Sequence, residues 1–128
     1  MTSPISFSKL PIIIELAEKG QAKGDIFRHL SPITINSIRR KMPLRGRTIR
    51  FRDHFVYFLS GVIAGVEKAK KQFKEGDLSF YASNGAMCFF MKDCDLSTPM
   101  NYLGRISSNL DILKNSTPGD VISVNQSE

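Results

Sequence analysis

The sequence of 128 residues contains no tryptophan, two cysteines and two histidines, and its apolar runs are short. The run Pro11–Ile14 is ended by Glu15, far below the ~20 apolar residues that a membrane-spanning helix needs. The first residues lack the basic segment followed by an apolar one that marks an export signal. We therefore expect a cytoplasmic protein with no membrane partner.

The few cysteines and histidines predict neither a disulfide nor a metal centre. Cys88 lies in an apolar segment, where a free thiol behaves as a small hydrophobic group. Cys94 lies between two aspartates, whose negative charge disfavours a reactive thiolate. His29 and His54 have no metal-ligand spacing to either cysteine. The expectation is a protein without a cofactor, with both cysteines reduced in a reducing compartment.

Length and composition are those of one globular domain. The chain is 41% hydrophobic and 23% charged, which argues against disorder. A chain of this length buries about two-thirds of the surface that its unfolded form exposes, enough for a core without disulfides. No internal repeat, low-complexity tract or linker divides it. We predict a single domain over residues 1–128, with residues 1–3 and 125–128 frayed.

The basic residues are unevenly distributed. Lysine and arginine number 18 against 12 acidic residues, for a net charge of +6. Seven basic residues lie close together in sequence: Arg39, Arg40, Lys41, Arg45, Arg47, Arg50 and Arg52. Such a cluster can bind nucleic acid or another polyanion, and its last four members are the candidate contacts. The alternative is a solvated basic hairpin. Phe51 is the only aromatic residue within the stretch, so no stacking platform for single strands is indicated.

Hydrophobic patterning predicts a mainly β protein with two or so short helices. Strands are expected over 11–17, 33–40, 47–58, 78–82, 86–91, 102–106 and 121–124. Short helices are expected over 22–30 and 108–114, and the Ser31-Pro32 pair is taken to end the first of them. Residues 61–74 could form a helix or a connector, and residues 92–101 are expected to form a polar loop.

The segment 76–91 has the pattern of a β-hairpin. Its first strand, 78–82, alternates apolar and polar residues. Asn84 and Gly85 follow, and both tolerate the positive φ angles of a tight reversal. Residues 86–91 are nearly all apolar, as in a strand that is buried on both faces.

Three segments resemble the compact cyclophilin-like family of bacteria and archaea. That family has a Gly-Asp-Ile/Val strand, an Ala-Leu-Cys-Ile-Phe-Phe strand and a Pro-Val-Asn-Val-Ile-Gly-Lys-Ile segment. The corresponding segments here are Gly76–Leu78, Ala86–Phe90 and Pro99–Ile106. The resemblance covers residues 76–124 and implies a closed cyclophilin-like β-barrel.

The resemblance also implies candidate site residues. Phe90 matches the phenylalanine that packs under the substrate proline in cyclophilins, and Arg39, or Arg40 in its place, is the nearest match to the catalytic arginine. Hydrogen bonding from such an arginine to the prolyl nitrogen would weaken the partial double bond that sets the ~18–20 kcal/mol isomerisation barrier. Met100 and Asn101 are expected to line the same groove.

Other parts of the cyclophilin site have no counterpart. The pocket glutamine is missing, and the loop that carries a tryptophan and a histidine is shortened to residues 97–101. We therefore expect a groove that binds a small ligand or an extended peptide rather than an efficient enzyme. A weak or degenerate peptidyl-prolyl isomerase is one alternative, and polyanion binding through residues 39–52 is another. Phe90 has a structural alternative as barrel core, and Arg39 and Arg40 as a solvated pair.

Overall fold

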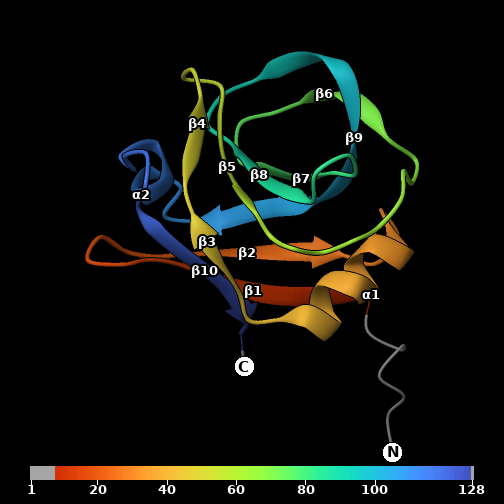
Figure 1. The fold of residues 1–128 in the computed structure, drawn as a ribbon, viewed down its shortest axis with the longest axis horizontal. Coiled ribbons are helices and arrows are strands. Elements are labelled where there is room, and N and C mark those ends of the chain that lie inside the picture. Colours follow the sequence, from red (N-terminus) through yellow and green to blue (C-terminus); the bar gives the residue numbers. More distant parts are fainter. Residues whose placement is uncertain (1–7, 128) are drawn as a thin grey trace, which may run out of the picture.

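The computed structural model describes residues 8–127 and consists mainly of β-strands (Figure 1). The strands are β1 (Lys9–Leu16), β2 (Gly20–Phe27), β3 (Leu44–Arg47), β4 (Ile49–Phe51), β5 (Phe55–Leu59), β6 (Lys70–Phe73), β7 (Asp77–Tyr81), β8 (Ala86–Phe90), β9 (Cys94–Ser108) and β10 (Val121–Gln126). The helices are α1 (Pro32–Lys41) and α2 (Asp111–Lys114). Within residues 8–127, neither helix has the length and hydrophobicity required to span a membrane.

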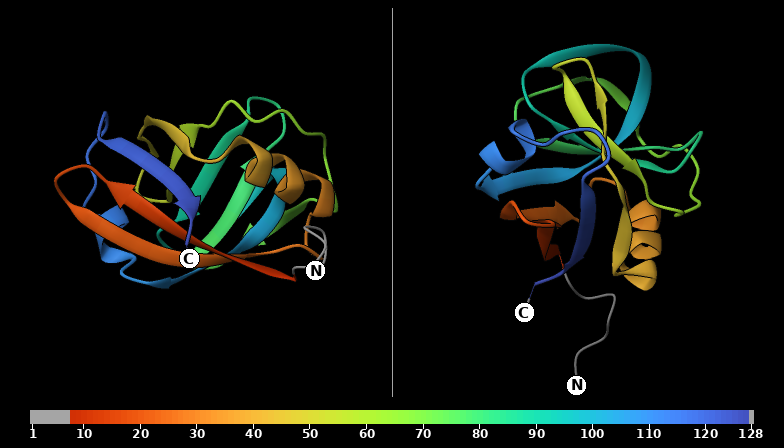
Figure 2. Two further views of the ribbon diagram at one scale, coloured as in Figure 1. Left: turned by 90° about the horizontal axis from the view of Figure 1, so that it is seen from below. Right: turned by 60° about the vertical axis from the view of Figure 1, so that its left-hand side comes forward.

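The strands form one curved antiparallel sheet. Their order is β3-β10-β1-β2-β9-β7-β8-β5-β4, and β6 pairs with β9 outside this path. The two ends of the path, β3 and β4, follow each other in the chain across Thr48, and no ladder pairs them within the described residues. The expected closed barrel is therefore not confirmed. The first half of β9 arches away from the rest of the sheet and carries β6 with it (Figure 2).

The helix expected over residues 22–30 is wrong, because this segment is β2. Residues 20–27 pair with all eight residues of β1, and Ala22, Gly24 and Ile26 alternate inward. The 3–4 spacing of the last apolar residues fits a helix equally well over so short a segment. The segment is a strand because it pairs with β1 on one edge and with β9 on the other.

The strand expected over residues 33–40 is also wrong, because this segment is α1. Ser31-Pro32 begins the helix rather than ending one, since proline is favoured in the first turn. The Ser31 hydroxyl does not cap the helix; it donates to the Tyr102 carbonyl. The cap comes from a distant loop: the Glu67 carboxylate accepts the backbone N–H groups of Ile33 and Thr34, each at 2.9 Å.

Three further segments differ in part from the prediction. The strand expected over 47–58 is divided into β4 and β5 by a reversal at residues 52–54, where Arg52 has a φ of 54°. Residues 61–69 form an irregular connector, one of the two forms expected, and β6 follows. The loop expected over 92–101 is mostly the first half of β9, because it pairs with β6, a strand the sequence pattern did not reveal.

Several elements are confirmed. β7 and β8 form the expected hairpin, and Gly85 has the positive φ, 75°, of its tight turn. α2 lies within the expected helix over 108–114. β10 is the expected last strand and continues to Gln126, which pairs with Ile12 of β1. Each of these elements is predicted by residues within the element itself, and its pairing or packing with distant residues agrees with that prediction.

The sheet carries two hydrophobic clusters, one on each face of β5, β7 and β8. Successive side chains of a strand point to opposite faces. Met87 and Phe89 of β8 therefore enter the larger cluster, with Phe80 of β7 and the apolar residues of β1, β2, β10 and α1. Cys88 and Phe90 enter the smaller one. The smaller cluster consists of Phe55, Phe73, Ala86, Cys88, Phe90 and Met100, and Cys94, Leu96 and Tyr102 of β9 pack against it.

Candidate functional site

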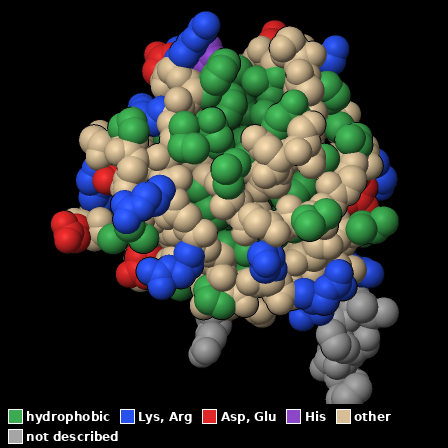
Figure 3. Space-filling view, viewed as in Figure 1, with side chains coloured by type: hydrophobic (Ala, Val, Ile, Leu, Met, Phe, Trp, Pro, Cys, Tyr) green, Lys and Arg blue, Asp and Glu red, His purple; other side chains and the backbone are tan. Residues whose placement is uncertain are grey.

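An open cleft of about 250 Å³ lies beside the smaller cluster, between the arch of β9 and the strands β4 and β5. Figure 3 shows hydrophobic side chains gathered in the hollow of this face. The lining residues are Phe51, Phe55, Tyr57, Tyr81, Asn84, Ala86, Cys88, Leu96, Ser97, Thr98 and Met100. The cleft is thus mainly aromatic and aliphatic.

Packed aromatic rings support the cleft from below. The ring centroids of Phe51 and Phe55 are 5.1 Å apart, and those of Phe55 and Phe90 are also 5.1 Å apart. Phe90 in turn stacks on Phe73 at 4.6 Å. These separations are those of favourable aromatic pairs. The floor is therefore packed before any ligand arrives.

The arch of β9 forms the opposite wall. Gln72 of β6 pairs with Asp95, whereas Lys70 pairs with Met100, so residues 96–99 bulge out of the ladder. The bulge brings Leu96, half-buried, and the exposed Ser97 against the cleft. The wall thus offers one apolar group and hydroxyl groups to a bound molecule.

No charged side chain is among the lining residues of this cleft. Its only thiol, Cys88, is buried, and burial raises the pKa of that thiol to about 12. The Sγ atom of Cys88 lies 3.9 Å from the Sδ atom of Met100. Cys88 therefore stays protonated at neutral pH, and it contributes packing rather than a nucleophile.

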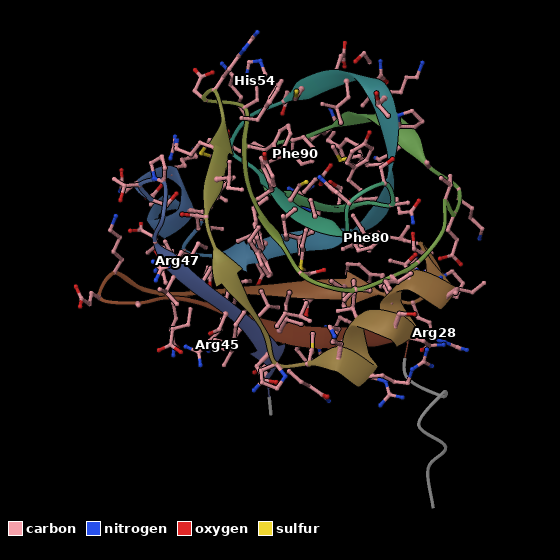
Figure 4. All side chains as sticks on the ribbon, in the orientation of Figure 1. Arg28, Arg45, Arg47, His54, Phe80 and Phe90 are labelled. Atoms are coloured by element: carbon pink, nitrogen blue, oxygen red, sulfur yellow. The ribbon has the colours of Figure 1, made fainter. Side chains whose placement is uncertain are left out.

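Two of the candidate residues belong to this cluster. Met100 lines the cleft, with 8% of its surface exposed. Phe90 is fully buried and lies behind the lining, among the rings of Phe55 and Phe73 (Figure 4). A ligand in the cleft would therefore rest on rings that Phe90 supports.

Asn101 points to the other face of β9. Its Nδ2 atom donates to Thr34 Oγ1 at 3.0 Å and to the Gly65 carbonyl at 2.9 Å. Its Oδ1 atom accepts the Glu67 backbone N–H at 2.7 Å. Asn101 thus ties β9 to α1 and to the connector 61–69. The structure separates it from Met100 because neighbouring residues of a strand face opposite sides.

Arg39 and Arg40 lie in the last turn of α1, Arg39 half-buried and Arg40 exposed. α1 packs Ile35 and Ile38 into the larger cluster, on the face of the sheet away from the cleft. Neither arginine is among the lining residues of the cleft. The structure therefore does not bring them together with Phe90 and Met100.

The other basic residues do not form one hairpin face. Arg45 and Arg47 are exposed on β3, far from the hairpin tip at His54 (Figure 4), and Arg47 Nη1 donates to the Gly119 carbonyl at 3.0 Å. Arg50 on β4 is half-buried, and its Nη1 atom donates to the Ser116 carbonyl at 2.8 Å. Arg52 lies in the turn between β4 and β5.

The aromatic lining of the cleft is not predicted by the sequence analysis. Phe51, Phe55 and Tyr57 lie within the strand predicted over 47–58, for which the sequence pattern predicts no site. A usable signal exists, since Phe55 and Tyr57 alternate with the core residues Val56 and Phe58. That alternation predicts an aromatic face opposite the core, although not what covers it.

A second, more polar cleft is lined by residues of β6, β7 and β9, among them Lys70, Asp77 and Tyr102. Buried Asp77 accepts hydrogen bonds from the Lys74 N–H at 2.8 Å and from the Tyr102 hydroxyl at 3.3 Å. Lys70 Nζ lies 3.9 Å from the centre of the Tyr102 ring. Burial, together with the charge of Asp77, raises the pKa of Tyr102. Within residues 8–127, no three His, Cys, Asp or Glu side chains are grouped to hold a metal ion.

Comparisons with known proteins agree with this architecture. A family model described as cyclophilin-like matches residues 8–125. The solution structure of the hypothetical protein AF2241 from Archaeoglobus fulgidus is similar, with a TM-score of 0.80, 20% identity, and coverage of 94% of this chain and 96% of that one. The structure of McbB in complex with tryptophan is similar with a TM-score of 0.76 and 12% identity, over 89% of this chain and 44% of that one. No curated protein matches the sequence.

Proposed function

The chain belongs to the cyclophilin-like family, and we propose that it binds a small apolar ligand, or an apolar side chain of an extended peptide, in the cleft under the β9 arch. The lining of the cleft carries this proposal: it is concave, mainly aromatic and aliphatic, and without a charged group. Small-molecule sites have this composition. A volume of about 250 Å³ is near the lower end for such sites and suits one ring or a short chain.

The packing around the cleft supports binding. The packed rings of Phe51, Phe55 and Phe90 hold the floor in place, so little side-chain freedom is lost when a ligand enters. Hydroxyl groups of Tyr57 and Thr98 are available at the lining to orient a polar part of the ligand. McbB, of which the matched part is 44% of its chain, was determined in complex with tryptophan.

The geometry favours binding over prolyl isomerisation. Catalysis by the cyclophilin route needs an arginine beside the bound proline, and neither of the two candidate arginines lines this cleft. Arg39 and Arg40 belong to α1, and Phe90 lies beneath the lining. A weak isomerase stays the alternative proposal. Polyanion binding is less favoured, because Arg50 donates to the Ser116 carbonyl instead of facing solvent.

An NMR titration of the ¹⁵N-labelled chain with indole and with Xaa-Pro peptides tests the proposal. Binding at the cleft shifts the amides of Ala86, Cys88 and Thr98. Tyr57→Ala removes a lining ring and is expected to weaken binding about two- to tenfold. Phe27→Ala, at a half-buried ring on β2, is the matched control and should leave affinity unchanged. Shifts confined to other regions, or none with any probe, contradict the proposal.

The same peptides distinguish the alternatives. Exchange spectroscopy measures whether the chain accelerates cis–trans exchange of the Xaa-Pro bond. Acceleration that disappears in Phe90→Ala and in Arg39→Ala, with both variants folded, would favour the isomerase. Binding to DNA or heparin that weakens steeply with salt would favour the polyanion alternative, because phosphate or sulfate contacts release counterions.

A further inference from the structure

Arg52 provides a cation beside the apolar cleft. It is exposed in the turn between β4 and β5, and its Cζ atom lies 5.5 Å from the centre of the Phe51 ring, which lines the cleft. Figure 3 shows basic side chains next to a histidine at the upper edge of the hollow, where Figure 4 labels His54. The guanidinium thus lies within cation–π range of a ring that lines the cleft.

The charge of Arg52 is not neutralised within the turn. The neighbouring Asp53 carboxylate is engaged by Lys92, with Oδ2 to Nζ at 3.0 Å, and Lys92 lowers the pKa of Asp53. Among residues 8–127, no carboxylate forms an ion pair with Arg52. The turn therefore presents one uncompensated cation to whatever occupies the cleft.

We propose that the cleft selects a small organic carboxylate, with its apolar body on the aromatic floor and its carboxylate on Arg52. This inference rests on the proposed function. A carboxylate inside the uncharged cleft would lose its hydration without a partner, so it must stay at the mouth. There the planar guanidinium can bind both carboxylate oxygens. A free aryl or alkyl acid and the apolar C-terminal residue of a peptide share this chemistry.

The test compares hydrocinnamate with its neutral amide, which has the same ring and chain. Both are titrated by NMR into the wild-type chain, Arg52→Gln, Arg52→Lys and Lys23→Gln, with the cleft amides as the readout. Lys23 is exposed on β2 and serves as the control for the loss of one positive charge. An exposed ion pair predicts that the wild type prefers the acid about two- to fivefold. Arg52→Gln should remove this preference, while Lys23→Gln keeps it and Arg52→Lys keeps part of it.

Other outcomes separate this inference from the proposed function. Equal binding of acid and amide in the wild type, at the cleft, overturns the carboxylate inference and leaves apolar binding standing. A preference that survives in Arg52→Gln also overturns it, because another cation then holds the acid. If neither probe shifts the cleft amides and apolar probes fail as well, the proposed function itself is wrong. Titration with a peptide that ends in Phe, with either a free or an amidated C-terminus, distinguishes a peptide ligand from a free acid.

Discussion

Met100 and Asn101 show how much one residue step changes a role. They are adjacent in β9, yet Met100 lines the cleft and Asn101 is hydrogen-bonded to α1 and the connector 61–69. A motif read along the chain groups them together. Strand alternation separates them, because the two side chains leave β9 on opposite faces.

We predict that Asn101→Ala destabilises the fold without removing a cleft contact. The substitution leaves the buried Thr34 hydroxyl, the Glu67 N–H and the Gly65 carbonyl without their Asn101 partner. An unsatisfied buried group costs about 1–3 kcal/mol, so urea unfolding should show a loss of at least that size. Asn125→Ala, at an exposed position on β10, is the control and should stay within about 0.5 kcal/mol of the wild type. An unchanged midpoint for Asn101→Ala would contradict the role assigned here.

We predict a second residue-scale effect in acid. The Lys19 hydrogen bond, at 2.7 Å, and the Thr117 N–H lower the pKa of Asp120 below its ordinary 3.8. Because the folded pKa is the lower one, the stabilisation is present above pH 3.8 and is lost as the pH falls through the folded value. Asp120→Asn should therefore flatten the acid limb of the curve of unfolding free energy against pH. Asp95→Asn, exposed on β9, is the control, and a limb unchanged in Asp120→Asn would refute the assignment.

At the scale of elements, β2 and β9 depend on glycine where their backbones meet. Gly104 pairs with Ile26, and a Cβ atom at Gly104 would overlap the Asp25 carbonyl oxygen. The close approach allows β9 to bond β2 on one edge and β7 on the other. The same pairing makes residues 20–27 a strand although their apolar spacing also fits a helix.

Gly104→Ala is expected to lower the free energy of unfolding by about 1–3 kcal/mol or more, because the two strands must separate. Gly65→Ala is the matched control: its Cβ atom would meet no atom within 4 Å. Thermal and urea unfolding of the two variants measure the difference. Equal stability of Gly104→Ala and the wild type would show that β2 and β9 can shift apart without cost.

At the scale of the whole molecule, the two hydrophobic clusters share strands. Phe80 of β7 and Phe89 of β8 belong to the larger cluster, whereas Phe90 of β8 belongs to the smaller one. A strand cannot unfold for one cluster and stay folded for the other. The sheet is therefore expected to unfold as one cooperative unit.

The three tyrosines make this cooperativity measurable, since the chain has no tryptophan and all three pack against the smaller cluster. Tyrosine fluorescence then follows the smaller cluster, and far-UV circular dichroism follows the whole sheet. In the wild type, in Phe80→Leu and in Phe90→Leu, we predict that the fluorescence and dichroism transitions have the same midpoint. Each variant should lose about 1–3 kcal/mol of the free energy of unfolding. A Phe90→Leu variant whose fluorescence transition separates from the dichroism transition would show that the smaller cluster unfolds alone.

Part of the candidate site could be found from sequence. The family motif led to Met100, which lines the cleft, and to Phe90, which lies just behind it. It could not lead to Phe51 or Tyr81, because their place in the cleft depends on how the β9 arch crosses β5 and the β7–β8 hairpin. The prediction put Arg39 in the same groove as Phe90 because it took the segment for a strand. The segment is the helix α1, which packs against the larger cluster on the other face of the sheet.

The sequence by itself determined the elements whose signals are local: the β7–β8 hairpin with its Asn84-Gly85 turn, α2, β10, and the cyclophilin-like family. Turn residues and alternation act over a few positions, so no distant partner is needed to interpret them. The tertiary structure alone decided β2, α1, the length of β9 and the cleft. Each of these depends on which strand or loop lies alongside, and backbone pairing and burial outweigh weak local preferences.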